Sequence, residues 1–475
     1  MNGRSWWLRC PALLCVACAA CGGSVRPSSD GGGGSDARTD AFVADVRSDS
    51  GVRDVTPADV RPVCPAGDTP LGRCDGTVLI RCVDGVSESQ ICASDTRCVG
   101  AVGATPARCE PLPTGSTTVS GRVQYARRPL TMRGLGTAAL EPLGGVPVQL
   151  VDGGGTTRGT TVTDGMGFYT ITAELPVGTM VLIRARAARS DATYQFSVEN
   201  FSGAVYATST PAFAAAPMVT RDLDIPEENN AGAYAIFDTI RDGLDFVRRT
   251  LPRTAPNLRV RWERGRTPPG GTSYFVRSQN AIFLLGGPSD SDEFDLPVIL
   301  HEFGHFVEQN YSRTSSRGGS HDGSPTDPRL AWGEGWGTWF GCAANADSRY
   351  LDALISGGLR VERDLANLPM VRANMGDAMQ PISQPVGEYL VGGSLWALSS
   401  AGMDPAMQLD RMLAVSLRYF TRMPAPDRGV TGVDFVDFLD GYLCLHGGAD
   451  RSVIENYVVT QRRFPYDFNF AGVCR

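Results

Sequence analysis

Apolar residues recur at helical spacing in the second half of the chain, from about residue 228 onward. In 231–251 (AGAYAIFDTIRDGLDFVRRTL) they stand three and four positions apart, which predicts an amphipathic helix. Pro297 suits the first turn of a second helix, where its missing N–H costs nothing, and acidic residues precede it. Between the two helices, short runs rich in Val, Phe and Tyr predict strands at 258–264, 272–278 and 281–287.

Residues 117–226 show a different pattern, in which short runs of Val, Thr and aromatic residues are separated by turn residues. These runs predict a β-sandwich, and they lie at 118–125, 145–152, 160–171 and 178–187. The order SGRV, GGVPVQLVD and TVTDGMGFYTITAELPVGTMVLIRA resembles the carboxypeptidase regulatory-like domain, a transthyretin-like β-sandwich. The resemblance implies an accessory domain, so no chemistry is assigned to this region.

Residues 63–112 contain six cysteines in a stretch too short to build its own hydrophobic core. No Cys-x-x-Cys pair and no nearby histidine is present, so disulfides are favoured over a metal site. Six cysteines allow fifteen pairings into three disulfides, and spacing does not choose between them. The run RCDGTVLIRCVDG predicts a short hairpin between turns.

The first 62 residues are predicted to serve export and display. Residues 1–21 have arginines followed by a short apolar run that ends at Cys21, which resembles a bacterial lipoprotein signal. Residues 22–62 are rich in Gly, Ser and Asp and are predicted to be a disordered linker. The chain is therefore expected in the bacterial cell envelope, lipid-anchored or secreted, with a lipid on Cys21 as its only contact with membrane.

Composition narrows the choice of partners. The chain has 475 residues, so several domains are expected. The net charge of −7 gives no electrostatic reason to expect nucleic acid as a partner. We expect a monomer that acts on a peptide or protein. Only four histidines occur, and two of them stand in one pentapeptide.

That pentapeptide, His301-Glu302-Phe303-Gly304-His305, predicts a metal site on the second helix. Imidazoles four residues apart lie one turn above each other, so both can reach a single Zn²⁺ ion. Glu302 is rotated by about 100° from His301, so it can face a water on the ion and take its proton. The alternative is a pair of hydrogen-bonded core histidines, which the rarity of histidine in this chain disfavours.

The third ligand is expected from a second helix. One known arrangement adds a Gly three residues after the second His and a third ligand His three residues further on. Glu308 and Tyr311 stand at those two positions here, so that arrangement is excluded. Glu334 lies 33 residues after His301, inside the aromatic run LAWGEGWGTWF. A carboxylate buried among such side chains is costly unless it is paired or binds a metal.

HEFGH and WGEGWGTW together resemble the gluzincin metallopeptidases, in which a glutamate is the third zinc ligand. GEYLVGGSLWAL resembles the fungalysin-like members of that group. For 228–475 the resemblance implies an α+β zincin-type peptidase domain with a helical C-terminal lobe. It also implies that the strand at 281–287 pairs with an extended peptide substrate.

The resemblance has one departure and leaves one role open. Gluzincins often carry an Asp four residues after the zinc Glu to orient a zinc His, and here Thr338 stands at that position. The residue that stabilises the oxyanion is not decided by spacing. Our candidates are His321 and Tyr389, ahead of Tyr311 and Tyr457.

The fourth histidine, several acidic residues and the last three cysteines are expected to have structural roles. His446 is expected to be structural. Asp322, Asp327 and the acids of 290–295 have no calcium-loop spacing, which favours helix caps and solvated loops over calcium ligands. A disulfide is predicted between Cys444 and Cys474, with Cys342 left unpaired.

The sequence thus predicts a multidomain zinc metallopeptidase: a disulfide-rich module, a β-sandwich and a zincin-type domain. His301, His305 and Glu334 are the predicted Zn²⁺ ligands, Glu302 the general base, and His321 or Tyr389 the oxyanion donor. The alternative is a non-catalytic zinc-binding surface adhesion or binding protein on the same fold.

Overall fold

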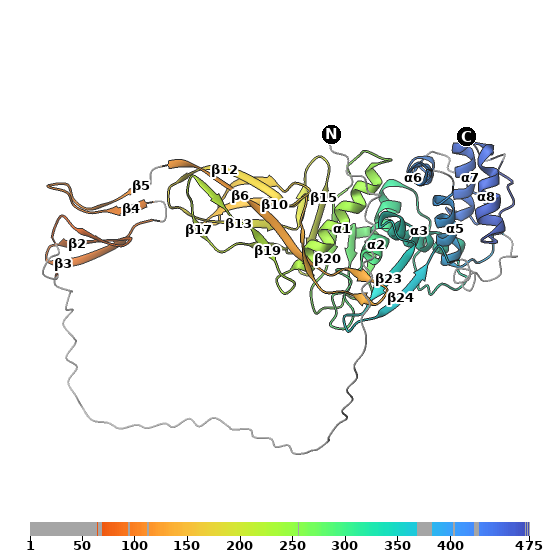
Figure 1. The fold of residues 1–475 in the computed structure, drawn as a ribbon, viewed down its shortest axis with the longest axis horizontal. Helices are drawn as coiled ribbons and strands as arrows, with labels where there is room; N and C mark the ends of the chain where they lie inside the picture. Colours follow the sequence, from red (N-terminus) through yellow and green to blue (C-terminus); the bar gives the residue numbers. More distant parts are fainter. Residues whose placement is uncertain are drawn as a thin grey trace, which may run out of the picture. The chain divides into compact units, whose positions relative to one another are not determined.

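The structure is a computed structural model of the chain. It describes Cys64 and residues 69–93, 96–111, 114–254, 256–367, 382–401, 404–421, 427–470, 472 and 474. The predicted signal at 1–21, the linker at 22–62 and Cys21 lie outside these residues. The structure confirms a multidomain chain that combines β-sheets with helices (Figure 1).

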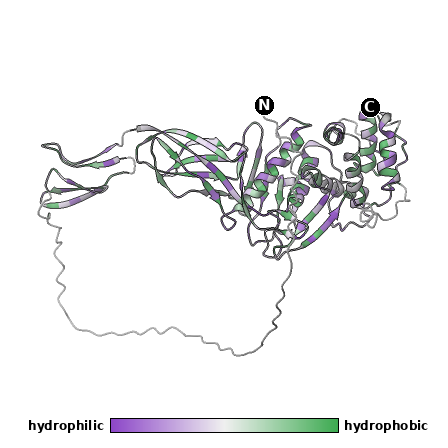
Figure 2. Cartoon of the chain, in the orientation of Figure 1, coloured by the Kyte–Doolittle hydropathy of each residue, from purple (hydrophilic) through white to green (hydrophobic). Residues whose placement is uncertain are grey.

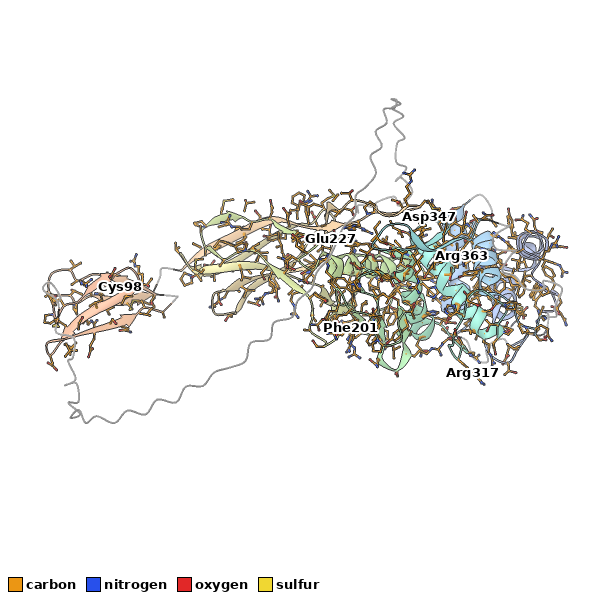
Figure 3. All side chains as sticks on the ribbon, turned by 90° about the horizontal axis from the view of Figure 1, so that it is seen from below. Cys98, Phe201, Glu227, Arg317, Asp347 and Arg363 are labelled. Carbon is orange, nitrogen blue, oxygen red and sulfur yellow. A yellow bond between two sulfur atoms is a disulfide. The ribbon has the colours of Figure 1, made fainter. Side chains whose placement is uncertain are left out.

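The cysteine-rich module is a small β-structure held by three disulfides. Its strands are β1 (Arg73–Asp75), β2 (Val78–Val83), β3 (Val86–Ile91), β4 (Thr96–Val99) and β5 (Arg108–Pro111). The predicted hairpin is present, because β1 and β2 pair antiparallel. The disulfides join Cys64 to Cys82, Cys74 to Cys98 and Cys92 to Cys109 (Cys98 is labelled in Figure 3). Few side chains are buried here, so these cross-links hold the module together.

The predicted sandwich consists of two five-stranded sheets. One sheet contains β10 (Pro147–Asp152), β11 (Thr157–Val162), β13 (Met180–Arg186), β16 (Ala207–Ser209) and β17 (Phe213–Ala214). The other contains β6 (Thr114–Arg127), β9 (Ala139–Pro142), β12 (Phe168–Pro176), β18 (Met218–Thr220) and β19 (Leu223–Ile225). Exposed and buried residues alternate along β12, as expected of a strand with one face on the core. Figure 2 shows that hydrophilic and hydrophobic residues are interspersed along the strands and helices of the chain.

A third, mixed sheet follows the order β14-β15-β20-β22-β21. Its members are β14 (Ala188–Ser190), β15 (Gln195–Glu199), β20 (Leu258–Arg261), β21 (Tyr274–Val276) and β22 (Ala281–Phe283). β15 runs parallel to β20 and β20 parallel to β22, whereas β21 is antiparallel to β22. Residues 188–199, which the sequence assigned to the sandwich, therefore pair with strands of the following domain, and one continuous core underlies both.

Helices build most of the remaining described residues, and two short hairpins complete the described strands. The helices are α1 (Ala231–Arg248), η1 (Arg277–Gln279), α2 (Leu296–Tyr311), α3 (Pro328–Ala344), α5 (Glu388–Ser399), α6 (Pro405–Ala414), η2 (Val415–Tyr419), α7 (Phe435–His446), η3 (Gly448–Asp450), α8 (Arg451–Ile454) and η4 (Glu455–Thr460). The hairpins are β7 (Leu130–Thr131) with β8 (Gly134–Leu135), and β23 (Arg349–Ala353) with β24 (Leu359–Asp364).

Helices α2 and α3 approach each other closely because glycines line their interface. A Cβ added at Gly304 of α2 would lie 3.2 Å from the Cα of Gly337 on α3. A Cβ added at Gly341 would lie 2.6 Å from the carbonyl oxygen of Pro297, closer than real Cβ atoms come. Gly337 and Gly341 of the GEGWGTWFG run therefore allow α3 to lie against the helix that carries both predicted zinc histidines.

The C-terminal segment is held by the predicted disulfide between Cys444 and Cys474. Cys342 is buried and unpaired, as expected. Four disulfides among the described residues indicate an oxidising compartment, which an extracellular or envelope protein occupies. Within the described part of the chain, no helix has the length and apolar character needed to cross a membrane.

Candidate metal centre

Helix α2 places His301 and His305 on one face, as their spacing predicts. Pro297 stands in the first turn of the helix, and the stripe Ile299, Phe303, Phe306 and Val307 is fully buried. That stripe fixes the rotation of the helix, so the two imidazoles turn toward α3. Their Nε2 atoms lie 3.1 Å apart.

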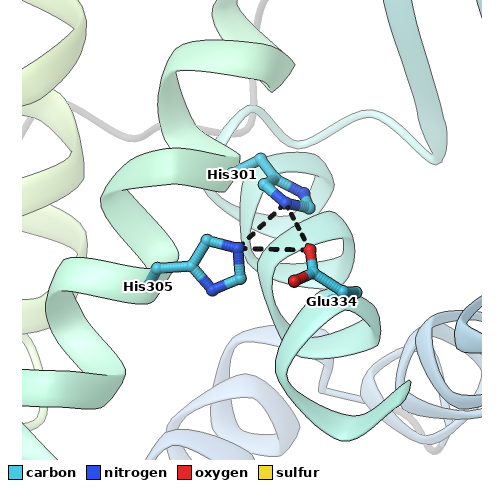
Figure 4. A group of neighbouring side chains, drawn as sticks. All are labelled: His301, His305 and Glu334. Carbon is cyan, nitrogen blue, oxygen red and sulfur yellow. Dashed lines mark hydrogen bonds and ion pairs between the residues drawn. The ribbon is translucent and has the colours of Figure 1, made fainter. Parts of the chain in front are cut away.

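Helix α3 supplies the third side chain. The Oε2 atom of Glu334 lies 3.2 Å from Nε2 of His301 and 3.3 Å from Nε2 of His305 (Figure 4). His301 and Glu334 are buried, and His305 is partly buried. The three side chains form a group that could hold a metal ion.

The charges of this group stabilise one another. Burial raises the pKa of Glu334, but the charges and hydrogen bonds of His305 and His301 outweigh burial and hold it well below its usual value. Burial lowers the pKa of His305, but the charge and hydrogen bond of Glu334, together with the charges of Glu302 and Glu308, outweigh burial and raise it to about 9. A metal cation bound between the three side chains could replace the proton on the imidazoles. The cation would then balance the charge of the Glu334 carboxylate, and the imidazoles would be neutral.

Glu302 lies beside this group without belonging to it. Its side chain is buried, and burial raises its pKa above the usual value for glutamate. The positive charges of His301 and His305 act in the opposite direction. A carboxylate whose proton affinity is raised in this way is suited to accept a proton from a reacting molecule.

Thr338, which stands where the gluzincins that the sequence resembles often carry an aspartate, contacts His301. Its Oγ1 lies 3.3 Å from Nδ1 of His301, one turn after Glu334 on α3. When His301 presents Nε2 to a metal, Nδ1 carries the hydrogen and the Thr338 hydroxyl accepts it. The sequence flagged this position as a departure but did not predict that threonine would fill the role.

His321 reaches the centre from the loop between α2 and α3. Its Nε2 lies 3.3 Å from Oε2 of Glu334, and its Nδ1 lies 2.8 Å from Oε2 of Glu388. The hydrogen bond to Glu388 is the main reason that the pKa of His321 rises to about 9. His321 keeps about a third of its side chain exposed, at 35 %, so it faces both the centre and solvent.

The tyrosine candidates are placed differently from His321. Tyr389 packs its ring against Gly323, where an added Cβ would lie 2.3 Å from the ring, and under the guanidinium of Arg363. Tyr389 therefore lies between the loop that carries His321 and strand β24. Tyr311 is buried against Phe306, and Tyr457 packs on the helical core.

Two residues of the site had no assigned role in the sequence analysis. Glu388, at the first position of α5, is buried and holds His321. Its only sequence signal was the GE pair before an apolar run. Tyr350 of β23 lies with its ring centroid 5.8 Å from that of His301, and no sequence signal connected these residues.

The strand expected to pair with a substrate is not at an edge. β22 (Ala281–Phe283) covers the first three residues of the predicted strand 281–287, and it is hydrogen-bonded to β20 on one side and to β21 on the other. Among the described strands, β21 ends this sheet. Phe275 of β21 makes an edge contact with Phe306 of α2. The available sheet edge beside the metal centre is therefore that of β21.

The acidic residues assigned to caps and solvated loops divide into two groups. Asp327 caps α3 by accepting a hydrogen bond from the N–H of Arg329, and Asp322 accepts from Ser324, as expected. The acids of 290–295 contradict that interpretation, because Asp292 and Asp295 are buried. Asp295 occupies the N-cap position of α2, yet its carboxylate accepts from the N–H of Ala353.

His446 has the structural role that was expected, because its Nε2 lies 3.0 Å from the carbonyl oxygen of Arg411. Burial lowers its pKa, so the ring is neutral at physiological pH. It lies on α7, in the helical lobe.

Comparisons with known proteins do not identify a family. No family model matches the chain, and a comparison with curated proteins finds no match. Among solved structures, the major plantain pollen allergen Pla l 1 is 14 % identical, with a TM-score of 0.13. That alignment covers 23 % of this chain and 94 % of the allergen. A likeness this weak carries no argument, so the chemistry has to be inferred from the site itself.

Proposed function

We propose that this chain is an exported zinc metallopeptidase. The observation that carries the proposal is the convergence of His301, His305 and Glu334, whose three ligand atoms lie 3.1 to 3.3 Å apart. Two ligands bound to one zinc ion at about 2.0–2.1 Å with a tetrahedral angle lie about 3.3–3.4 Å apart. The spacing of the three side chains therefore suits zinc without rearrangement.

The donor set supports zinc over other common ions. Two imidazoles and one carboxylate form a three-ligand set typical of catalytic zinc, whereas calcium and magnesium prefer oxygen ligands. The fourth position is left for water or substrate in such sites. Zinc bound there supplies Lewis-acid activation of water and of a carbonyl group.

The surrounding residues supply the rest of a hydrolytic site. Glu302 accepts the proton of the attacking water and passes it to the leaving amine. His321, held by Glu388, donates a hydrogen bond to the oxygen that becomes negative as the carbonyl is attacked. Thr338 keeps His301 in the tautomer that leaves Nε2 free.

A peptide is the substrate best suited to the surface beside this centre. β21 presents a sheet edge next to α2, and an extended peptide can add to such an edge as a further strand. The mixed sheet with an antiparallel edge strand, two helices carrying the ligands and a helical lobe agrees with a zincin-type domain. The resemblance of HEFGH and WGEGWGTW to gluzincins supports the same assignment.

The accessory regions are consistent with display outside the cytoplasm. The disulfide-linked module requires an oxidising compartment. We propose that the chain is attached to a bacterial membrane through a lipid on Cys21, with residues 22–62 as a spacer and the sandwich as an accessory domain.

The proposal is tested with the purified chain, a set of unstructured peptides and zinc analysis. We expect peptide cleavage that is lost with a chelator, restored by Zn²⁺ and abolished in Glu302→Gln. The Glu302→Gln variant should retain zinc, because Glu302 is not a ligand. Retained zinc without cleavage in the unmodified chain would instead support the non-catalytic binding protein. Full cleavage by Glu302→Gln would refute the mechanism.

A further inference from the structure

A second group of potential ligands lies in the segment that leads into α2 and on the neighbouring hairpin. Carboxylate oxygens of Asp290, Asp292 and Asp352 lie within 4.8 Å of one another. Asp290 and Asp292 precede α2, and Asp352 stands on β23. A backbone bridge between Asp290 and Leu354 holds the segment and the hairpin together.

In each of these three carboxylates, one oxygen is buried without a hydrogen-bond partner among the described residues. Asp292 is only 2 % exposed; its Oδ2 accepts a hydrogen bond from Ser273, and its Oδ1 has no partner among the described residues. The Oδ1 atoms of Asp290 and Asp352 are likewise buried and without a hydrogen-bond donor in the described part of the chain. Leaving a buried carboxylate oxygen unpaired costs about 1–3 kcal/mol or more.

Among the described residues, one arginine balances part of the charge of this group. Arg360 pairs with Asp290, and no other ion pair to these three carboxylates is found among the described residues. Asp295 adds a fourth acid nearby, with its own Oδ1 buried and without a partner. Three or four carboxylates facing one arginine repel each other, so either protons or a cation must neutralise them.

We propose that Asp290, Asp292 and Asp352 form a calcium site. Calcium binds carboxylate oxygens at 2.3–2.6 Å, so two oxygens on opposite sides of one ion lie at most about 4.6–5.2 Å apart. All three carboxylates meet that limit. Asp352 is only partly buried, which leaves room for water to complete a shell of six to eight oxygens.

The position of the site gives the ion a structural consequence. Asp295, the N-cap residue of α2, binds the N–H of Ala353 on β23. The same strand places the ring of Tyr350 beside His301. Calcium bound by Asp292 and Asp352 therefore joins β23 to the start of the helix that carries both zinc histidines. This inference does not rest on the proposed peptidase activity, since it requires only that calcium binds.

The test is a calorimetric titration of the calcium-free, zinc-loaded full chain with CaCl₂. We expect one Ca²⁺ per chain, with a dissociation constant of about 10⁻⁴–10⁻³ M, the range of extracellular calcium modules. Asp352→Asn removes one ligand from a partly exposed position, so the fold should tolerate it. It should weaken binding by about tenfold or more, because calcium affinity follows the charge count of the ligands.

The control is Asp437→Asn, which removes a buried carboxylate from the capping box of α7. It should bind calcium with unchanged affinity even if the variant is less stable. Asp290→Asn provides a second ligand variant should Asp352→Asn fail to fold. The proposal is overturned if the unmodified chain shows no saturable calcium binding, or if folded ligand variants bind as tightly as it does. Because neither readout is hydrolysis, loss of the peptidase hypothesis would leave this result intact.

Discussion

The contact between Thr338 and His301 allows a sharp test of how this chain orients its proposed zinc ligand. Thr338 is buried, and its Oγ1 lies 3.3 Å from Nδ1 of His301. Thr338→Val keeps the shape of the side chain and removes the hydroxyl. The Nδ1–H of His301 then loses its acceptor in a buried environment, and the ring is less firmly held with Nε2 toward the metal.

The size of the effect follows from the contact. Loss of a partner that orients a zinc histidine costs about 10–100-fold in metal affinity. The contact here joins two neutral groups at 3.3 Å, which is long for a hydrogen bond. We therefore expect the lower end, about tenfold, which equals about 1.4 kcal/mol in the free energy of zinc binding.

The assay is competition for Zn²⁺ between the protein and a chromophoric chelator, with two control variants. Thr338→Ser retains the hydroxyl and should bind zinc within about twofold of the unmodified chain. Thr338→Asp introduces a charged acceptor and should bind zinc more tightly, because a carboxylate raises the basicity of the histidine. Equal zinc affinity in Thr338→Val and the unmodified chain would show that Thr338 does not orient His301.

Three further predictions follow from other contacts. His321→Gln should lower kcat by about 10²-fold while zinc content stays unchanged. Adding Glu388→Gln should lower kcat little further, because Glu388 acts through His321. Zinc loss in His321→Gln, measured by metal analysis, would instead make His321 a ligand. Gly341→Ala should lower the free energy of unfolding by about 1–3 kcal/mol, since its Cβ would meet the Pro297 carbonyl oxygen; unchanged urea unfolding would contradict this packing. Burial and the charge of Asp290 raise the pKa of Asp352 to about 6. Protons therefore compete with Ca²⁺, and calcium affinity should weaken as the pH falls through about 6. Calorimetry at pH 5 and pH 7.5 measures this change, and equal calcium affinity at both values would refute the prediction.

Much of the secondary structure near the centre was predictable because it depends on neighbours in the sequence. The helix at Leu296–Tyr311 follows from an apolar stripe with helical period and a proline in its first turn. The alternation along β12 follows in the same way from a period of two. The disulfide between Cys444 and Cys474 was predicted by counting, since few cysteines were left to pair.

Pairings between distant segments were not predictable by the same means. Fifteen pairings were open for the six cysteines of the small module, and the packing of its strands selects one of them. β15 lies in the sandwich region of the sequence but pairs with β20. The sequence of so short a strand does not indicate which strand it pairs with, because both sheets accept the same apolar alternation.

At the candidate metal centre, the sequence by itself determined the two imidazoles and Glu302. Their relative placement depends only on the pitch of one helix, which is the same wherever the helix lies. The sequence also nominated Glu334, by the cost of burying a carboxylate among aromatic residues. These inferences needed no knowledge of how the helices pack.

Only the tertiary structure decided what surrounds these ligands. It placed Thr338 on His301, Glu388 on His321, and Asp352 beside Asp290 and Asp292. Each of these contacts joins side chains from separate elements, and distances across an interface depend on how closely the elements approach. In this chain, glycines set that approach between α2 and α3. Local periodicity thus predicts which residues share a face, and packing determines which faces meet.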